Sequence, residues 1–135
     1  MKSFETYNFN KIGNLEIGYL TALEEKKDGV PFQIKRVYYI YNVPNQVNRG
    51  FHAHKELKQI LICLSGSVEI RVEKGDITEN FKLNDPTKGL FINALVWREM
   101  YNFSNDAVLL VLASDIYKED DYIRDYQEFL KFNKR

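Results

Sequence analysis

Two histidines lie two residues apart in the segment His52-Ala53-His54, and they are the only histidines of the chain. Side chains on a β-strand alternate between its two faces, so this spacing places both imidazoles on one face. An imidazole has an unperturbed pKa of about 6.5, so it both accepts and releases protons near neutral pH. The pair predicts proton-transfer chemistry by two acid–base groups, with two adjacent packed or surface histidines as the alternative.

A second segment carries an arginine and a tyrosine at the same two-residue spacing. Alternation along residues 34–41 places Arg36 and Tyr38 on one face of a strand and their neighbours on the other. We expect the Arg36/Tyr38 face to line the interior of the fold, where both side chains offer hydrogen-bond donors to a bound molecule. The alternative is a solvated arginine beside a packed tyrosine.

The elements that position these side chains are short runs of β-branched and aromatic residues, separated by Gly, Asn, Asp and Pro. Such runs are typical of antiparallel β proteins. We predict strands over residues 15–23, 32–41, 49–54, 59–65, 67–72, 78–83, 89–92, 98–103 and 107–113. Helical spacing of apolar residues occurs only in the tail, residues 114–130. The pattern predicts an all-β sandwich or jelly roll with a short C-terminal helix.

The size and charge of the chain set further limits. Its 135 residues, of which 44% are hydrophobic, correspond to a single domain over residues 1–135. Basic and acidic side chains number 19 each, so no net charge attracts nucleic acid or an anionic membrane. No apolar stretch approaches the roughly 20 residues that a membrane span needs. The N-terminus does not resemble a secretory signal, and Cys63 lies in an apolar run that predicts a buried, inert thiol, so we expect a cytoplasmic protein.

Segment 50–66, which holds the histidine pair and Gln59, resembles the first motif of the cupin superfamily, and segment 89–102 resembles a degraded second motif. The resemblance implies a cupin jelly-roll β-barrel, and most cupins bind a metal through two histidines, a carboxylate and a third histidine. Here Gln59 stands in place of the carboxylate and Arg98 in place of the third histidine. Arginine offers no free lone pair and carries a permanent charge, so we expect no metal. A metal would have to recruit unplaced carboxylates such as Glu56, Glu69 and Glu99.

A narrower resemblance extends over nearly the whole chain. Segments 31–40, 49–54, 59–67, 96–100, 111–115 and 121–124 resemble, in this order, the sugar-nucleotide 3,4-ketoisomerases. This resemblance implies a metal-free, cofactor-free isomerase that moves the ketone of dTDP-4-keto-6-deoxyglucose from C4 to C3 through an enediol or enediolate, for the biosynthesis of unusual amino sugars. It also implies a homodimer with an exchanged N-terminal strand, for which segment 15–20 is the candidate.

The reaction suggests a role for each candidate residue. We expect His54 to act at carbon C3, His52 to act at the oxygens, and Tyr38 to be a third catalytic group. The candidates for substrate binding are Arg36, Arg49, Gln59, Arg71, Trp97 and Arg98. Arginines suit the negative enediolate and the diphosphate because of their charge and planar fork of donors, and the indole of Trp97 suits stacking on thymine.

Three other functions stay open at this point. A dTDP-sugar 3,5-epimerase removes a proton beside the same ketone, but the resemblance to such enzymes implies a longer chain and a histidine–aspartate pair, and the sequence shows no evident aspartate partner. A non-catalytic cupin that binds a sugar nucleotide is the second alternative, and it would have to act through a protein partner. A metal-dependent dioxygenase is the third.

Overall fold

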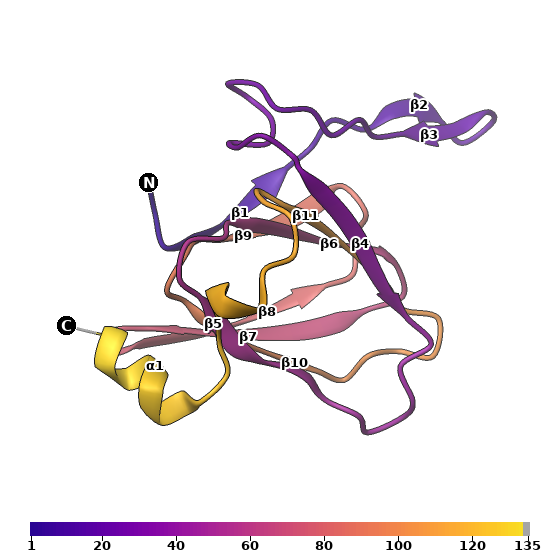
Figure 1. Ribbon diagram of the computed structural model, residues 1–135. Helices are drawn as coiled ribbons and strands as arrows, with labels where there is room; N and C mark the ends of the chain where they lie inside the picture. The colour runs from indigo at the N-terminus through magenta and orange to yellow at the C-terminus, as the bar shows by residue number, and fades with distance from the viewer. Residues whose placement is uncertain (134–135) are drawn as a thin grey trace.

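Two antiparallel β-sheets packed face to face form the body of the computed structural model, which describes residues 1–133 (Figure 1). The first sheet has the strand order β1 (Phe4–Asn8), β9 (Lys88–Ile92), β6 (Gln59–Ser65), β11 (Val108–Ala113) and β4 (Arg36–Tyr41). The second has the order β12 (Tyr122–Ile123), β5 (Arg49–His54), β10 (Trp97–Tyr101), β7 (Val68–Lys74) and β8 (Ile77–Leu83). This arrangement confirms the predicted all-β jelly roll with a short C-terminal helix.

Apolar side chains from the facing sides of the two sheets fill the space between them. Leu61 and Val111 of the first sheet and Ile70 of the second belong to this core and are fully buried. Cys63 is also part of the core, where burial raises the pKa of its thiol, as expected for an inert cysteine. The outer face of β6 is covered as well, since Ile60 packs with apolar residues of the chain before β4, which explains the unbroken apolar run at residues 60–64.

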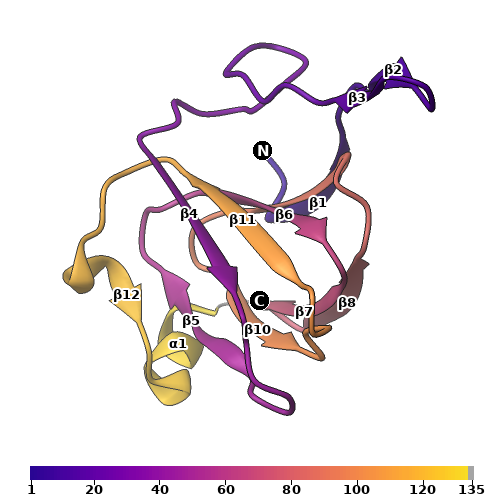
Figure 2. The same ribbon diagram turned by 90° about the vertical axis from the view of Figure 1, so that its right-hand side faces the viewer.

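The C-terminal tail forms less helix than its spacing predicts. Helix α1 covers only Tyr126–Phe132 and is capped by Asp125, whose side chain accepts a hydrogen bond from the backbone N–H of Gln127. Before it, a 3₁₀ turn, η1 (Glu119–Asp121), leads into β12, which pairs with β5 (Figure 2). The prediction of one helix over residues 114–130 is therefore wrong for residues 114–125. Within residues 1–133, no helix is long and apolar enough to cross a membrane.

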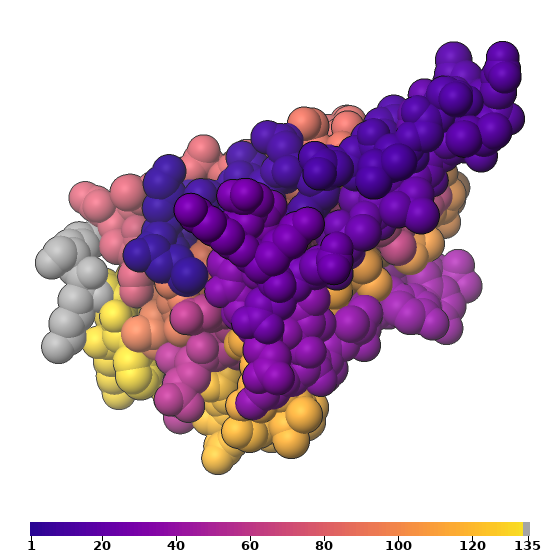
Figure 3. Space-filling model, turned by 90° about the horizontal axis from the view of Figure 1, so that it is seen from above, coloured from indigo at the N-terminus to yellow at the C-terminus, as the bar shows by residue number. Residues whose placement is uncertain are grey.

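The N-terminal region also departs from the prediction. Instead of a strand over residues 15–23, the chain forms a hairpin of β2 (Ile12–Asn14) and β3 (Gly18–Leu20), which projects from the sheets (Figures 1 and 3). The turn forms because the side chain of Asn14 accepts hydrogen bonds from two following backbone N–H groups, and such a polar turn interrupts the alternation. Strand β1, which pairs with β9, was not predicted from the sequence.

The remaining strands agree closely with the prediction. Every strand predicted between residues 49 and 113 forms, with ends shifted by two residues or fewer. The strand predicted over residues 32–41 begins only at Arg36. Within it, Arg36 and Tyr38 are partly buried whereas Val37 and Tyr39 are more than half exposed, so the predicted division of faces is confirmed.

Candidate active site

Strand β5 places the two imidazoles side by side on the inner face of the second sheet. The ring centroids of His52 and His54 lie 4.9 Å apart, and His54 is only 1% exposed. A β-bulge precedes them: Gly50 and Phe51 both have positive φ, and the pairing with β10 shifts register opposite them. A Cβ at Gly50 would come within 3.1 Å of the backbone oxygen of Arg98, so a glycine fits this close approach of the two strands.

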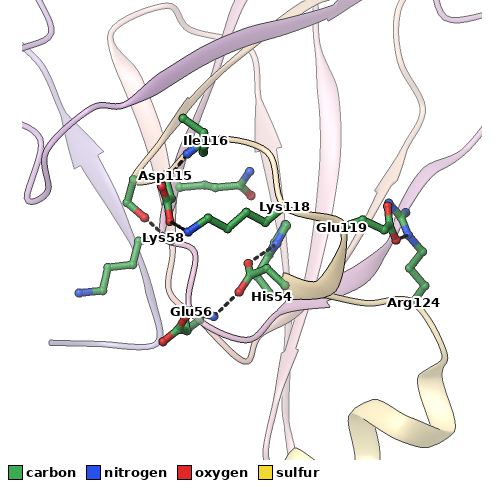
Figure 4. A network of polar contacts seen from close by, with 12 residues as sticks. His54, Glu56, Lys58, Asp115, Ile116, Lys118, Glu119 and Arg124 are labelled. Atoms are coloured by element: carbon green, nitrogen blue, oxygen red, sulfur yellow. Dashed lines mark hydrogen bonds and ion pairs between the residues drawn. The ribbon is translucent and has the colours of Figure 1, made fainter.

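An aspartate from the C-terminal tail contacts the deeper histidine. Nδ1 of His54 lies 3.0 Å from Oδ2 of Asp121. The other carboxylate oxygen, Oδ1, accepts a hydrogen bond of 2.9 Å from the backbone N–H of Glu56. In Figure 4, dashed lines mark the contacts of this carboxylate with His54 and with Glu56. The expectation that the histidines have no aspartate partner is therefore wrong, because the segment around Asp121 was predicted to be helical and instead forms a 3₁₀ turn beside β5.

Tyr122 covers both imidazoles. Its ring centroid lies 5.0 Å from that of His52 and 4.4 Å from that of His54. The guanidinium carbon of Arg124 lies 4.0 Å from the centroid of the same ring, and Arg124 donates two hydrogen bonds of 2.9 Å to Glu119. Tyr122 and Arg124 were not predicted as functional residues, although both stand in a segment that resembles the ketoisomerases.

A chain of buried polar side chains connects the two sheets beneath the histidines. Arg98, which is fully buried and pairs with His52 across the strands, donates from Nη1 to Oε1 of Gln59 at 2.6 Å. Nε2 of Gln59 in turn donates to the hydroxyl of Tyr38 at 2.9 Å. The structure thus brings Tyr38, Gln59 and Arg98, all predicted from the sequence, to the histidine pair.

The electrostatics of this site keep both imidazoles neutral. Burial, followed by the nearby charge of Arg98, lowers the pKa of His52 to about 3. The same two causes lower the pKa of His54 well below its usual range, and His52, Arg36 and Arg124 add to the effect. Burial raises the pKa of the Tyr38 hydroxyl, so the phenol stays protonated. At neutral pH the site therefore contains two neutral imidazoles, one neutral phenol and a buried cation.

Three buried side-chain nitrogens have no hydrogen-bond partner within residues 1–133: Nε of Arg36, Nε2 of His54 and Nε of Arg98. Leaving a buried polar atom unpaired costs about 1–3 kcal/mol, so native proteins rarely retain such atoms without a reason. The three belong to three different strands and to residues of one site. We interpret them as hydrogen-bonding capacity kept for a bound molecule.

A cleft of about 400 Å³ opens onto this site. His52 and Tyr38 line it, together with three arginines, which are Arg36, Arg49 and Arg124. Several positive charges around one opening attract an anionic ligand, and guanidinium groups bind phosphates with paired hydrogen bonds. The cleft therefore suits a phosphorylated molecule whose reacting end reaches His52.

Two of the predicted binding residues lie elsewhere. Trp97 is buried under helix α1 against Phe129, and its indole N–H donates to Glu99. Arg71 lies on the same outer face of the second sheet, within 4 Å of the carboxylates of Glu73 and Glu99. Side chains alternate along β7 and β10, so these residues point away from the histidine pair. The structure does not bring Trp97 or Arg71 into the site, in contrast to the roles expected from the sequence.

The residues around the histidine pair do not fit a metal ion. The buried guanidinium of Arg98 contributes a positive charge beside both imidazoles, and the amide oxygen of Gln59 already accepts its hydrogen bond. In the part of the chain that the structure describes, no three His, Cys, Asp or Glu side chains gather closely enough to hold an ion. No catalytic step through a metal is assigned to this site.

Three known proteins that are 47–49% identical to this chain are sugar 3,4-ketoisomerases by name. A TDP-4-oxo-6-deoxy-alpha-D-glucose-3,4-oxoisomerase from Aneurinibacillus thermoaerophilus is 49% identical over 125 residues, which is 93% of this chain and 88% of that protein. The crystal structure of a variant of the 3,4-ketoisomerase QdtA from Thermoanaerobacterium thermosaccharolyticum, in complex with TDP-4-keto-6-deoxyglucose, matches with a TM-score of 0.93 at 47% identity, covering 98% of this chain and 95% of that one. A 3,4-ketoisomerase from Helicobacter canadensis matches with a TM-score of 0.91 at 49% identity, covering 98% of both chains.

More distant structures share the fold alone. NovW, a 4-keto-6-deoxy sugar epimerase from Streptomyces spheroides, matches with a TM-score of 0.74 at 15% identity, covering 90% of this chain and 68% of that one.

The FdtA family model, described as "WxcM-like, C-terminal", matches residues 2–134. Since this model spans nearly the whole chain and a 3,4-oxoisomerase is 49% identical over most of its length, the chain belongs to the FdtA family of sugar 3,4-ketoisomerases.

Proposed function

We propose that this protein is an isomerase that moves the ketone of dTDP-4-keto-6-deoxyglucose from C4 to C3 and so gives a dTDP-3-keto-6-deoxyhexose. The names of its relatives supply the substrate and the reaction. The observation that carries the proposal is the pair of neutral, buried imidazoles beside the buried cation of Arg98. A base must be unprotonated to accept a proton, and a fixed cation stabilises the anion that forms.

The reaction moves two protons and leaves the substrate's composition unchanged. One imidazole removes the proton from C3, and the electron pair of the C–H bond forms the C3–C4 double bond while negative charge moves to the oxygen on C4. The proton of the C3 hydroxyl passes to the oxygen on C4. The protonated imidazole, whose N–H exchanges with solvent, then gives a proton to C4, and the ketone remains at C3. Every group required is an acid–base group, and no external oxidant or reductant enters.

We propose that His52 acts at the carbon atoms and that His54 carries the proton between the two oxygens, the reverse of the division expected from the sequence. His52 lines the arginine-rich cleft together with Tyr38. His54 lies deeper, with one ring nitrogen engaged by Asp121 and the other without a partner. A single free nitrogen suffices to accept a proton from one oxygen and return it to the other.

The remaining polar groups stabilise the enediolate intermediate and bind the diphosphate of the substrate. Arg98 and Tyr38 supply donors to the enediolate, because each holds its proton at neutral pH and has a fixed position through Gln59. Arg36 and Arg49 line the cleft and bind the diphosphate of the substrate.

We further propose a homodimer in which the β2–β3 hairpin packs on the partner subunit. The hairpin projects away from its own sheets (Figure 3), and Leu15 and Ile17 at its turn are 90% and 79% exposed. The outer face of edge strand β4 presents Val37, Tyr39 and Tyr41, which are also exposed. Exposed apolar side chains and an unpaired strand edge are commonly covered in oligomers. A monomer in gel filtration with light scattering would refute this proposal.

We also infer that residues 1–135 act as a single domain in the cytoplasm. One apolar core between the two sheets supports the first statement, because strands from most of the chain contribute to it. The buried free thiol of Cys63 supports the second.

The test is proton NMR of the purified, chelator-treated protein with dTDP-4-keto-6-deoxyglucose in D₂O. We expect the ketone to move to C3 and deuterium to enter at C4. His52→Asn and His54→Asn each remove an acid–base group at nearly constant size, so turnover falls at least about a hundredfold in each. An unchanged spectrum with the wild-type protein would refute the proposal and favour a sugar-nucleotide-binding module.

The contact between His54 and Asp121 favours one second candidate, a dTDP-sugar 3,5-epimerase, since a histidine–aspartate pair is what the resemblance to those enzymes implies. The same spectrum separates the two reactions. Exchange at C3 and C5 with the ketone still at C4 indicates the epimerase, whereas a ketone at C3 indicates the ketoisomerase.

A further inference from the structure

Both carboxylate oxygens of Asp121 are engaged, each by a different partner. Oδ1 accepts the backbone N–H of Glu56, and Oδ2 lies at hydrogen-bond distance from Nδ1 of His54. The aspartate itself is held in place by the tail, because β12 pairs directly after it with the strand that carries His54. The carboxylate is thus fixed relative to the imidazole at both ends.

This arrangement determines which nitrogen of His54 carries the proton. A neutral imidazole has one N–H, and a carboxylate is only an acceptor, so the contact with Asp121 forms when the proton is on Nδ1. Nε2 is then an acceptor, and it is the nitrogen that is buried without a partner. The ring stays neutral because burial and the neighbouring arginines lower the pKa of His54.

We propose that Asp121 is a positioning residue that holds the proton of His54 on Nδ1 and so keeps Nε2 ready to accept a proton from the substrate. The consequence for the reaction rests on the ketoisomerase function proposed above, whereas the consequence for the tautomer does not.

The backbone N–H of Glu56 determines how an asparagine at position 121 is oriented. In Asp121→Asn, that N–H requires the amide oxygen of the new side chain at the Oδ1 position. The amide NH₂ then occupies the Oδ2 position and donates to Nδ1 of His54. The imidazole has to move its proton to Nε2, so the variant inverts the tautomer while it preserves the size and the hydrogen bonds of the site.

The first experiment is ¹⁵N NMR of protein labelled in its histidine rings. The chain has only two histidines, so His52→Asn leaves the two ring nitrogens of His54 alone in the spectrum. We expect the shift of a protonated nitrogen at Nδ1 and that of an unprotonated nitrogen at Nε2, and the reverse after Asp121→Asn. A proton on Nε2 before the substitution, or the same tautomer in both proteins, would overturn the proposal.

The second experiment is steady-state kinetics on variants with His52 intact. Asp121→Asn lowers kcat at least about a hundredfold, because a protonated Nε2 accepts no proton, and it leaves the affinity for dTDP unchanged. The matched control is Asp120→Asn, which changes a neighbouring, exposed carboxylate and keeps wild-type kcat. An inverted tautomer with undiminished kcat would also overturn the positioning role. Wild-type protein that has the expected tautomer and no isomerase activity would instead refute the proposed function alone.

A second variant, Asp121→Ala, tests the proposal independently of whether Asp121→Asn folds correctly. Asp121→Ala removes the carboxylate and opens space beside a second cleft, of about 640 Å³, which Asp121 lines together with His54 and Tyr122. We expect formate to raise the kcat of Asp121→Ala, since it returns an acceptor to Nδ1 of His54, and to leave that of Asp121→Asn unchanged, where the space is filled. Equal activation of both variants would contradict the tautomer argument.

Discussion

The two buried histidines make the stability of the protein depend on pH in a window where few other groups titrate. Folding holds both imidazoles neutral, with the pKa of His52 lowered to about 3 and that of His54 lowered as well. In the unfolded chain each has a pKa of about 6.5. Below that value the unfolded state binds more protons than the native state, so the free energy of unfolding falls as the pH falls.

The size of the effect follows from the number of protons. Between pH 6.5 and pH 5.0, each histidine that stays neutral in the native state costs about 1.6 kcal/mol of stability, and the two together cost about 3 kcal/mol. Carboxylates contribute little in this window, because their unfolded pKa values lie near 4. A loss of about 3 kcal/mol is large against the roughly 5–15 kcal/mol that stabilises a typical domain.

Urea unfolding at the two pH values measures this loss, at one protein concentration because assembly also affects stability. The single tryptophan, Trp97, is 3% exposed, so its fluorescence reports unfolding. His52→Asn should halve the pH dependence, and the double variant with His54→Asn should abolish it. Equal stability of the wild type at pH 6.5 and 5.0, or an undiminished dependence in the double variant, would refute the assignment of two neutral histidines.

Two further predictions concern the arginines and the tryptophan. Arg98→Met removes the buried cation and leaves Oε1 of Gln59 without its donor, so kcat/KM falls by an amount equivalent to about 2–4 kcal/mol in steady-state assays. Arg71→Met is the matched control, because Arg71 lies on the outer face of the sheet, and equal losses in both variants would contradict the assignment. Trp97→Phe leaves the affinity for dTDP unchanged in calorimetry, since the indole packs under helix α1, and a clear loss of affinity would restore the stacking role expected from the sequence.

The sequence alone predicted the parts of the site that depend on local geometry. The two-residue period of a strand places His52 beside His54, and it places Arg36 with Tyr38, whatever the rest of the fold does. The resemblance to the cupin superfamily pointed to Gln59 and Arg98 as departures from a metal site. The structure adds that these two side chains hydrogen-bond to each other, across 39 residues of sequence.

The C-terminal tail shows where local patterns are insufficient. Its apolar spacing suits a continuous helix, yet only residues 126–132 form an α-helix, and Ile123 reaches the same cluster as Phe129 from a strand. Ile123 and Phe129 are buried whereas Tyr126 and Leu130 are exposed, so the helical spacing identified only part of the face that meets the core. The strand form brings Asp121 to His54, which stands 67 residues earlier.

Tertiary structure alone decided which candidates share the site. Alternation tells which side chains of one strand lie together, but the choice of inner face depends on how the two sheets pack. That packing buries Arg98 between the sheets and turns Trp97, its neighbour in sequence, toward helix α1. Residue types and periods therefore fixed the chemistry available to this protein, and the burial of apolar surface between and outside the sheets decided which groups meet to perform it.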